Sequence, residues 1–252
     1  MERSKLAKDL YNLIGLYSDY IEDSFPQKRN APDLSFFDKV EKSVEVKQVV
    51  KKEEKIVKKE QDVNILNKRK EIINIATQII KCEQCQLCKI SKIKIPGVGD
   101  PFANVMVITD FVTDEEEAAK LPLIGNTGDF FKKWMGAINL SVDDLFITHL
   151  IKCNPKKNTI TKDFIEQCRI HLDKQIELIK PKLILVLGDF VLSSLMKRFL
   201  DIKVNHGKVF QYKNIPFIAT FHPKDVLQNQ TLKKPVWDDL KILQNLYKER
   251  IV

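Results

Sequence analysis

Apolar residues recur at helical spacing in two stretches of the first third of the chain. Between residues 4 and 22 they fall every three or four positions, a period that predicts an amphipathic helix, and the same period returns from residue 63 to 80. Between these stretches Lys and Glu alternate in blocks such as VKKEEKIVKKEQD, a pattern typical of a solvated linker. We therefore predict an N-terminal amphipathic helix within residues 1–25, a charged linker over 26–62 and a folded domain over 63–252.

From residue 104 onward, short β-branched runs alternate with longer amphipathic runs. The short runs predict strands at residues 104–109, 145–148, 182–187, 209–212 and 217–220. The longer runs predict helices at residues 128–138, 163–179 and 236–250. This alternation is typical of an α/β fold with three layers, in which helices cover both faces of a central, mostly parallel sheet.

The tails of these strands carry the candidate chemistry, because open parallel sheets bind ligands beyond the carboxyl ends of their strands. Asp110, His149 and the FHP step at residues 221–223 follow predicted strands. Each has a structural alternative: Asp110 as a cap of the next turn, His149 as a core histidine, and His222 as a residue fixed at a proline turn. The acidic run Asp114–Glu117 is interpreted as the solvated start of a helix.

Four of the five cysteines form two pairs, Cys82-x2-Cys85 and Cys153-x14-Cys168. Ligation by thiolates alone suits either zinc or an iron–sulfur cluster, and the spacing does not separate the two. Cys168 also fits a small apolar residue on the buried stripe of its helix. The fifth cysteine, Cys88, leaves open which thiols of the run CEQCQLC bind.

Composition and charge bear on the cellular compartment and on the class of binding partner. A net charge of +8 and a pI near 9.1 are compatible with a phosphate-backbone partner, although lysine-rich chains without such a partner share them. No apolar run reaches the roughly 18 residues that span a bilayer, and the start MERSKLAKDL lacks the apolar segment of a secretory signal. We therefore expect a cytoplasmic protein, in which clustered cysteines more often bind metal than form disulfides.

Eight landmarks along the chain together resemble the family 4 uracil-DNA glycosylases over about residues 80–250. In order they are Cys-x2-Cys-x-Leu, PGVGDP, NVMVIT, PLIG-x2-G, FITHLIKCNP, the helix carrying Cys168, KLILVLG and FHP. The resemblance implies a sheet of the uracil-DNA glycosylase type, behind a helical and linker extension at the N-terminus. It also implies DNA as partner and a [4Fe–4S] cluster held by Cys82, Cys85, Cys153 and Cys168, with Cys88 at a position that is not a ligand.

The resemblance also implies two catalytic residues. The family's GEAPG loop is here TDFVT at residues 109–113, so that both glycines and the proline are absent and Asp110 stands where the family has Glu. Asp110 would act as the carboxylate near the sugar. His222, in the family's closing His-Pro motif, would donate to the leaving uracil.

Four further residues are implied as substrate-binding. Leu123 stands where the family has the aromatic that stacks on uracil, and His149 stands where it has Asn. Val226 and Leu227 follow the His-Pro motif, where the family carries the residues that wedge into the duplex.

Three functional hypotheses follow. The first is a uracil-DNA glycosylase, supported by Asp110, His222 and the cysteine set. The second is a non-catalytic iron–sulfur protein that binds DNA as an accessory of replication or repair, favoured by the altered loop at residues 109–113. The third is a zinc-bound structural module. We expect a monomer, with the N-terminal helix as a candidate contact for a protein partner.

Overall fold

The structure is a computed structural model that describes residues 64–251. The predicted helix within residues 1–25 and the predicted linker at 26–62 lie outside the described residues. By internal contacts the chain divides into two units, Met1–Ile73 and Asn74–Val252. Residues 64–73 of the first unit are helical, and the second unit opens with residues 74–80, which are also helical, in agreement with the apolar period there.

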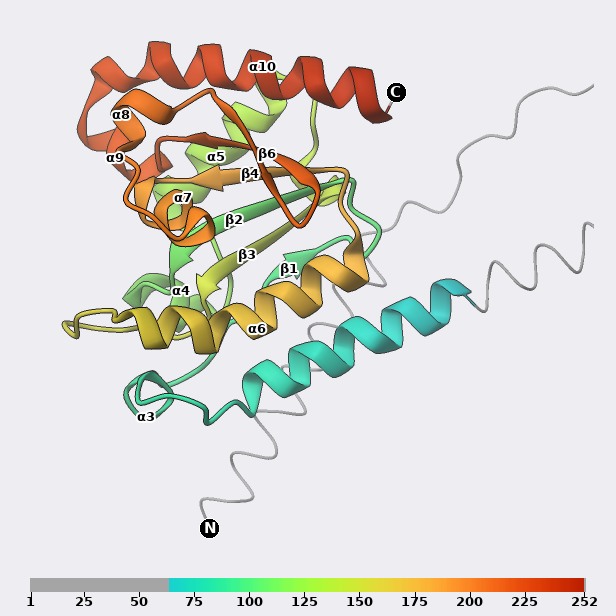
Figure 1. Ribbon diagram of the computed structural model, residues 1–252, viewed down its shortest axis with the longest axis vertical. Coiled ribbons are helices and arrows are strands. Elements are labelled where there is room, and N and C mark those ends of the chain that lie inside the picture. The colour runs from blue at the N-terminus through green and yellow to red at the C-terminus, as the bar shows by residue number, and fades with distance from the viewer. Residues whose placement is uncertain (1–63, 252) are drawn as a thin grey trace, which may run out of the picture. The chain divides into compact units, whose positions relative to one another are not determined.

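The second unit is built on a six-stranded sheet in the order β1-β3-β2-β4-β6-β5 (Figure 1). The four central strands run parallel, and they are β3 (Leu145–Ile151), β2 (Val105–Phe111), β4 (Leu183–Leu187) and β6 (Ile215–Thr220). The two edge strands run antiparallel to their neighbours, and they are β1 (Val98–Gly99) and β5 (Val209–Tyr212). The prediction of a mostly parallel sheet is confirmed.

Helices cover both faces of this sheet. α6 (Lys162–Ile179) packs on β3 and α7 (Asp189–Met196) on β2 and β4, and both lie in front of the sheet in Figure 1. α5 (Gly125–Ala137) lies behind it, and α10 (Lys233–Ile251) packs on β4 and β6. Right-handed crossovers produce this division, because β2 leads through α5 toward one edge of the sheet whereas β3 leads through α6 toward the other. The predicted three-layer α/β/α fold is confirmed.

Short helices complete the unit. They are α3 (Leu87–Ile90), α4 (Asp114–Ala119), α8 (Ile202–Asn205) and α9 (Pro223–Gln228), with 3-10 turns η2 (Val142–Asp144) and η3 (Gln230–Leu232). Residues 64–251 contain no helix long and apolar enough to cross a membrane.

The central strands form the core, and β2, β3 and β6 extend beyond their predicted ends. All seven residues of β3 are buried, although the apolar run in the sequence ends before Thr148 and His149. The prediction stopped at Thr148 because a polar pair ordinarily marks the end of a buried strand. Here both polar side chains find partners inside: Thr148 Oγ1 donates to the Pro96 carbonyl oxygen at 3.0 Å, and His149 contacts a buried carboxylate.

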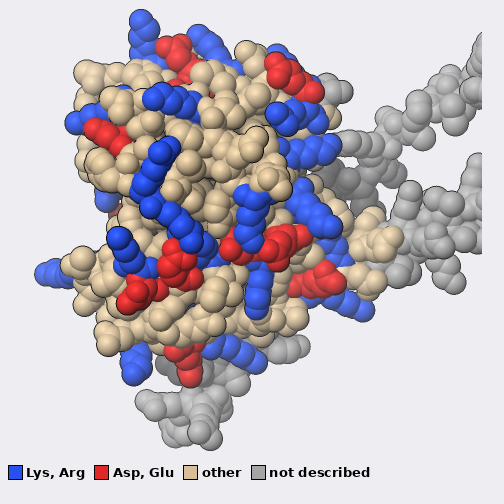
Figure 2. Space-filling view, viewed as in Figure 1, with Lys and Arg blue, Asp and Glu red and all other residues tan. Residues whose placement is uncertain are grey.

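The face that carries α6 and α7 is mixed in charge. Figure 2 shows acidic and basic side chains interspersed there. Lys213 Nζ lies 3.3 Å from Asp173 Oδ2 and 2.7 Å from Glu177 Oε1, and Lys197 Nζ lies 3.7 Å from Glu166 Oε2. Paired charges of this kind leave little net field, so this face is not a uniformly basic surface for DNA.

Candidate active site and cysteine cavity

Two of the predicted chemical groups meet at the carboxyl edge of the sheet. Asp110 lies near the end of β2, and His222 follows the end of β6. Both strands flank β4 in parallel, so their carboxyl ends emerge at the same edge. The His222 Nε2 and Asp110 Oδ1 atoms are 3.9 Å apart, and Thr109 Oγ1 lies 2.9 Å from the first and 3.2 Å from the second.

His222 also has a structural role, as its alternative interpretation proposed. It is the N-cap of α9, with Pro223 at the first helical position, and its Nδ1 accepts a hydrogen bond from the Lys224 backbone N–H at 3.1 Å. Burial lowers the pKa of His222, against the opposing charge of Asp110. The ring is therefore neutral near pH 7, and its proton sits on Nε2 because Nδ1 is the acceptor.

An open cavity of about 340 Å³ lies in front of this pair. It is lined by residues from the end of β2, from α4, from the start of α5 and from α9: Asp110, Phe111, Thr113, Asp114, Glu115, Glu116, Ile124, Thr127, His222 and Lys224. A cavity of this size falls in the range of small-ligand sites, which run from about 300 to 1,000 Å³.

The acidic run Asp114–Glu117 starts a helix as its composition predicts, but only Asp114 and Glu115 of the run are exposed. Glu116 and Glu117 are buried, each 6% exposed. Thr113 caps α4 in a capping box, in which Thr113 Oγ1 accepts from the Glu116 N–H at 3.2 Å and Glu116 Oε2 accepts from the Thr113 N–H at 2.9 Å. Asp110 therefore does not cap this helix. The pattern Thr-x-x-Glu at residues 113–116 is the sequence signal that could have revealed this buried carboxylate.

Glu116 links the loop to the predicted substrate-binding residues. Its Oε2 lies 3.2 Å from His149 Nε2, and its Oε1 accepts from the Leu123 N–H at 2.7 Å. Burial opposes ionisation of Glu116, but the hydrogen bond and charge of His149 and the N–H groups of Thr113 and Leu123 outweigh it and lower the pKa to about 2. Glu116 is thus an ionised, fully hydrogen-bonded carboxylate that fixes its neighbours.

The other predicted substrate-binding residues lie deeper than expected. Leu123 is buried, and His149 is completely buried with no partner at its Nδ1 among the described residues. Val226 needs a correction, because it is completely buried and packs α9 onto the interior instead of presenting a wedge. Leu227, the next residue on this helix, is 38% exposed and is free to contact a ligand.

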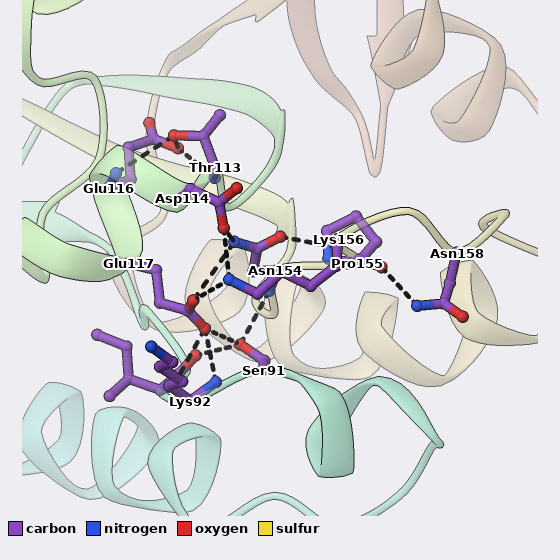
Figure 3. A network of polar contacts seen from close by, with 11 residues as sticks. Ser91, Lys92, Thr113, Asp114, Glu116, Glu117, Asn154, Pro155, Lys156 and Asn158 are labelled. Carbon is purple, nitrogen blue, oxygen red and sulfur yellow. Dashed lines mark hydrogen bonds and ion pairs between the residues drawn. The ribbon is translucent and has the colours of Figure 1, made fainter.

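Glu117 joins three segments in a polar network that the sequence did not reveal (Figure 3). Its Oε1 accepts from Ser91 Oγ at 3.0 Å and from the Lys92 N–H at 2.6 Å. Its Oε2 accepts from Lys156 Nζ at 2.6 Å and from Asn154 Nδ2 at 3.4 Å. The network ties α4 to the segment after α3 and to the segment after β3.

Those two segments lead from cysteines, and all five cysteines line one cavity. The four predicted ligands come from the loop before α3 (Cys82, Cys85), the chain just after β3 (Cys153) and α6 (Cys168). Cys168 Sγ accepts from the Lys152 N–H at 3.2 Å. Burial raises the pKa of Cys168 to about 11, so a thiolate at this position requires a cation beside it.

The residues that line the cavity suit a group that is bound by thiolate ligands and that also accepts a hydrogen bond. His171 lines it, is 4% exposed, and has no partner at either ring nitrogen among the described residues. Burial lowers the pKa of His171 to about 4, so the ring is neutral and its N–H needs an acceptor. Among residues 64–251 no group of three His, Cys, Asp or Glu side chains is placed for a single metal ion. Thiolate ligands suit both zinc and an iron–sulfur cluster, so the cysteines by themselves do not separate the two.

Comparisons with known proteins agree with this geometry. Residues 96–241 match the uracil DNA glycosylase superfamily. The Type-4 uracil-DNA glycosylase of Sulfurisphaera tokodaii is 31% identical over 182 residues, which cover 68% of this chain and 83% of that protein. The Type-4 enzyme of Saccharolobus solfataricus is 33% identical over 66% of this chain and 82% of its own length. The Type-4 enzyme of Thermotoga maritima is 26% identical over 72% and 97%.

Proposed function

Because the chain belongs to the family 4 uracil-DNA glycosylases, we propose that it excises uracil from DNA, the opening reaction of base-excision repair. The observation that carries this proposal is the meeting of Asp110 and His222 at one cavity at the carboxyl edge of the sheet. These two groups match the two demands of the reaction, a carboxylate near the sugar and a donor at the base.

In the proposed reaction the target nucleotide leaves the duplex and its base enters the cavity. The C1′–N1 bond breaks, and its electron pair leaves with the uracil. Asp110 stabilises the positive charge on the sugar and orients the water that adds to C1′, whose released proton passes to solvent or to the base. His222 donates its Nε2–H to the uracil oxygen where negative charge develops, which is the kind of stabilisation that lowers such barriers most.

We assign recognition of the base to Leu123 and His149, which both contact Glu116 in the wall of the cavity. In parallel pairing His149 stands opposite Thr109, so the two residues share one face of the sheet at its carboxyl edge. The unpartnered Nδ1 of His149 supports a contact with a base atom. At the DNA surface we assign the apolar wedge to Leu227 alone, with Lys224 of the same helix beside the phosphate backbone.

We infer further that Cys82, Cys85, Cys153 and Cys168 hold a [4Fe–4S] cluster. When bound, the cluster would cross-link the loop before α3, the end of β3 and α6, segments that are far apart in the sequence. Their common cavity and the orphaned ring of His171 support the inference. Reduced cysteines of this kind suit the cytoplasm, where we place the reaction.

A gel assay tests the activity. Uracil-containing single- and double-stranded oligonucleotides are incubated with the iron-loaded protein, and abasic sites are then cleaved with alkali. We expect cleavage at uracil and none in matched oligonucleotides that carry thymine or cytosine. Intact uracil strands at stoichiometric protein, together with tight DNA binding, would instead support the non-catalytic accessory protein, which the altered loop at residues 109–113 favours.

A further inference from the structure

Thr109 stands between the two reacting groups, at the position where the GEAPG loop of the family has its first glycine. Its side chain is buried within β2, and the residue is 1% exposed. The direct separation of His222 Nε2 and Asp110 Oδ1, 3.9 Å, is too long for a hydrogen bond. Thr109 Oγ1 lies within hydrogen-bond distance of both, at 2.9 Å and 3.2 Å. The hydroxyl therefore bridges two groups that do not bond each other.

The direction of donation along this bridge follows from Lys224. Its backbone N–H donates to His222 Nδ1 at 3.1 Å, so in the neutral ring Nε2 carries the proton. Nε2–H then donates to Thr109 Oγ1, and the hydroxyl's own proton is left to donate to Asp110 Oδ1. The chain of donation runs from His222 through Thr109 to Asp110.

We propose that Thr109 is a positioning residue that couples His222 to Asp110, an inference that rests on the proposed function of these two residues. In the free protein its hydroxyl holds the imidazole with Nε2–H in place beside the cavity. It also holds Oδ1 of Asp110, which leaves Oδ2 for the sugar and its water. When uracil enters, His222 Nε2–H donates to the base oxygen in place of Thr109 Oγ1, while the hydrogen bond from Thr109 to Asp110 remains.

The bridge also gives a role to two departures from the family's GEAPG motif, Thr109 in place of the first glycine and Asp110 in place of the glutamate. Asp110 is one methylene shorter than the Glu it replaces, so its carboxylate reaches less far. A hydroxyl on the preceding residue fixes that shorter carboxylate. Positioning of this kind matters because a displacement of about 1 Å at a reacting group can cost about a hundredfold in rate.

The first test compares Thr109→Val, which keeps the β-branched shape and loses the hydroxyl, with Thr109→Ser, which keeps the hydroxyl. Single-turnover rates of uracil excision are measured beside the affinity for the same oligonucleotide. We expect Thr109→Val to be at least about tenfold slower with affinity changed by less than about twofold, and Thr109→Ser to stay within about threefold of the parent rate. A Thr109→Val protein as fast as the parent would overturn the proposal.

A second test does not depend on activity. Nitrogen-15 NMR of the histidine ring in the free, iron-loaded protein reports which nitrogen of His222 carries the proton and how fast that proton exchanges with water. We expect the proton on Nε2, with faster exchange in Thr109→Val and unchanged exchange in Thr109→Ser. A proton on Nδ1, or exchange that is the same in all three proteins, would overturn the bridge.

The two tests separate the bridge from the function on which it rests. If the parent protein leaves uracil strands intact while NMR shows the expected proton and exchange rates, the proposed function fails and the bridge stands as a feature of the fold. If the parent excises uracil and Thr109→Val excises it equally well, the function stands and the proposal about Thr109 fails.

Discussion

At the scale of single residues, the site depends on which atom of each polar side chain is already engaged. His222 Nδ1 accepts the hydrogen bond that caps α9, so Nε2–H is the ring group available for the reaction. Both oxygens of Glu116 are engaged by Thr113, Leu123 and His149. This buried carboxylate therefore orders the residues around the cavity and is not free to bind a substrate. Asp110, at a strand end and with Oδ1 alone in contact with Thr109, is the carboxylate of the cavity that lies beside His222.

Replacement of either reacting group should slow excision without unfolding the protein. We expect Asp110→Asn and His222→Ser each to lower the single-turnover rate by about a hundredfold or more, because each removes a charge or donor present at the transition state. Serine is chosen because it retains an oxygen that caps α9. Asp129→Asn, at an exposed carboxylate of α5, is the matched control and should keep the parent rate. Parent-like rates for both site variants would refute the assignment.

Glu116 should make stability depend on acid. Its folded-state pKa is about 2, whereas an unfolded glutamate titrates at about 4.3. A depressed pKa stabilises the fold above the unfolded value, and this stabilisation is lost as the pH falls from about 5 toward 2. Thermal midpoints measured across that range should therefore fall less steeply in Glu116→Gln, which starts from a lower midpoint at pH 7. Parallel curves for the two proteins would contradict the prediction, and Asp129→Asn should follow the parent.

At the scale of elements, α4 is the part that joins the cysteine segments to the reacting loop. Its cap, Thr113, follows the end of β2, its Glu116 contacts His149 in β3, and its Glu117 contacts the segments that follow α3 and β3. A six-residue helix has little stability of its own, so these contacts and the capping box hold it in place. One short helix therefore connects the segments that follow α3 and β3 to the end of β2, where Asp110 lies.

Loss of the Glu117 carboxylate should loosen this connection. In Glu117→Gln one oxygen is replaced by a donor, which faces the donors of Lys156, Asn154 and Lys92. We expect a loss of about 1–3 kcal/mol in the free energy of unfolding, since a buried charged hydrogen-bond partner is removed. Hydrogen exchange should rise at residues 91–93 and 154–156 and stay unchanged in β4.

Glu115→Gln is the matched control for this change, because Glu115 lies on the same helix but is exposed. It should leave stability and exchange as in the parent protein. Equal protection of residues 91–93 in Glu117→Gln and Glu115→Gln would show that the network does not hold the segment.

At the scale of the whole molecule, the fold brings together groups that are dispersed over about 140 residues of sequence. The cysteine cavity gathers thiols from residues 82 to 168, and the reacting site gathers side chains from residues 109 to 222. The two sites are separate, and α4 lies between them in the network of contacts. The cluster that we propose therefore stabilises the fold, while the residues that carry out the reaction lie at the ends of the strands.

The cysteines provide a direct check at this scale. Ser replacements of Cys82, Cys85, Cys153 and Cys168 should each lower the iron content per chain and the thermal midpoint of the purified protein, because a four-thiolate cluster loses a ligand. Cys88→Ser is the matched control, since Cys88 lines the same cavity and should keep the parent iron content. Stoichiometric zinc in a colourless parent protein, or iron loss on replacing Cys88 alone, would contradict the ligand set.

Local pattern in the sequence was sufficient for several features. Apolar periods predicted strands β2 to β6 and the helices α5, α6 and α10, but not the shorter helices α7, α8 and α9. Strand–helix alternation predicted the parallel sheet, because it depends on which residues must be buried nearby in the chain. The placement of Asp110 and His222 at strand tails followed from the same pattern, since parallel strands present their carboxyl ends at one edge. The order of the family's landmarks implied the cysteine ligand set, which stays a prediction.

Tertiary structure alone decided the partners of the polar residues. Composition predicted a solvated acidic run, but Glu116 and Glu117 are buried because β3 and the segments after α3 and β3 supply their hydrogen-bond donors. Val226 is apolar and was expected at the DNA, but the register of α9 turns it inward. The bridge through Thr109 joins residues 113 positions apart, and no local pattern reports such a contact. Burial of a polar group depends on a partner, and the fold supplies that partner from elsewhere in the chain.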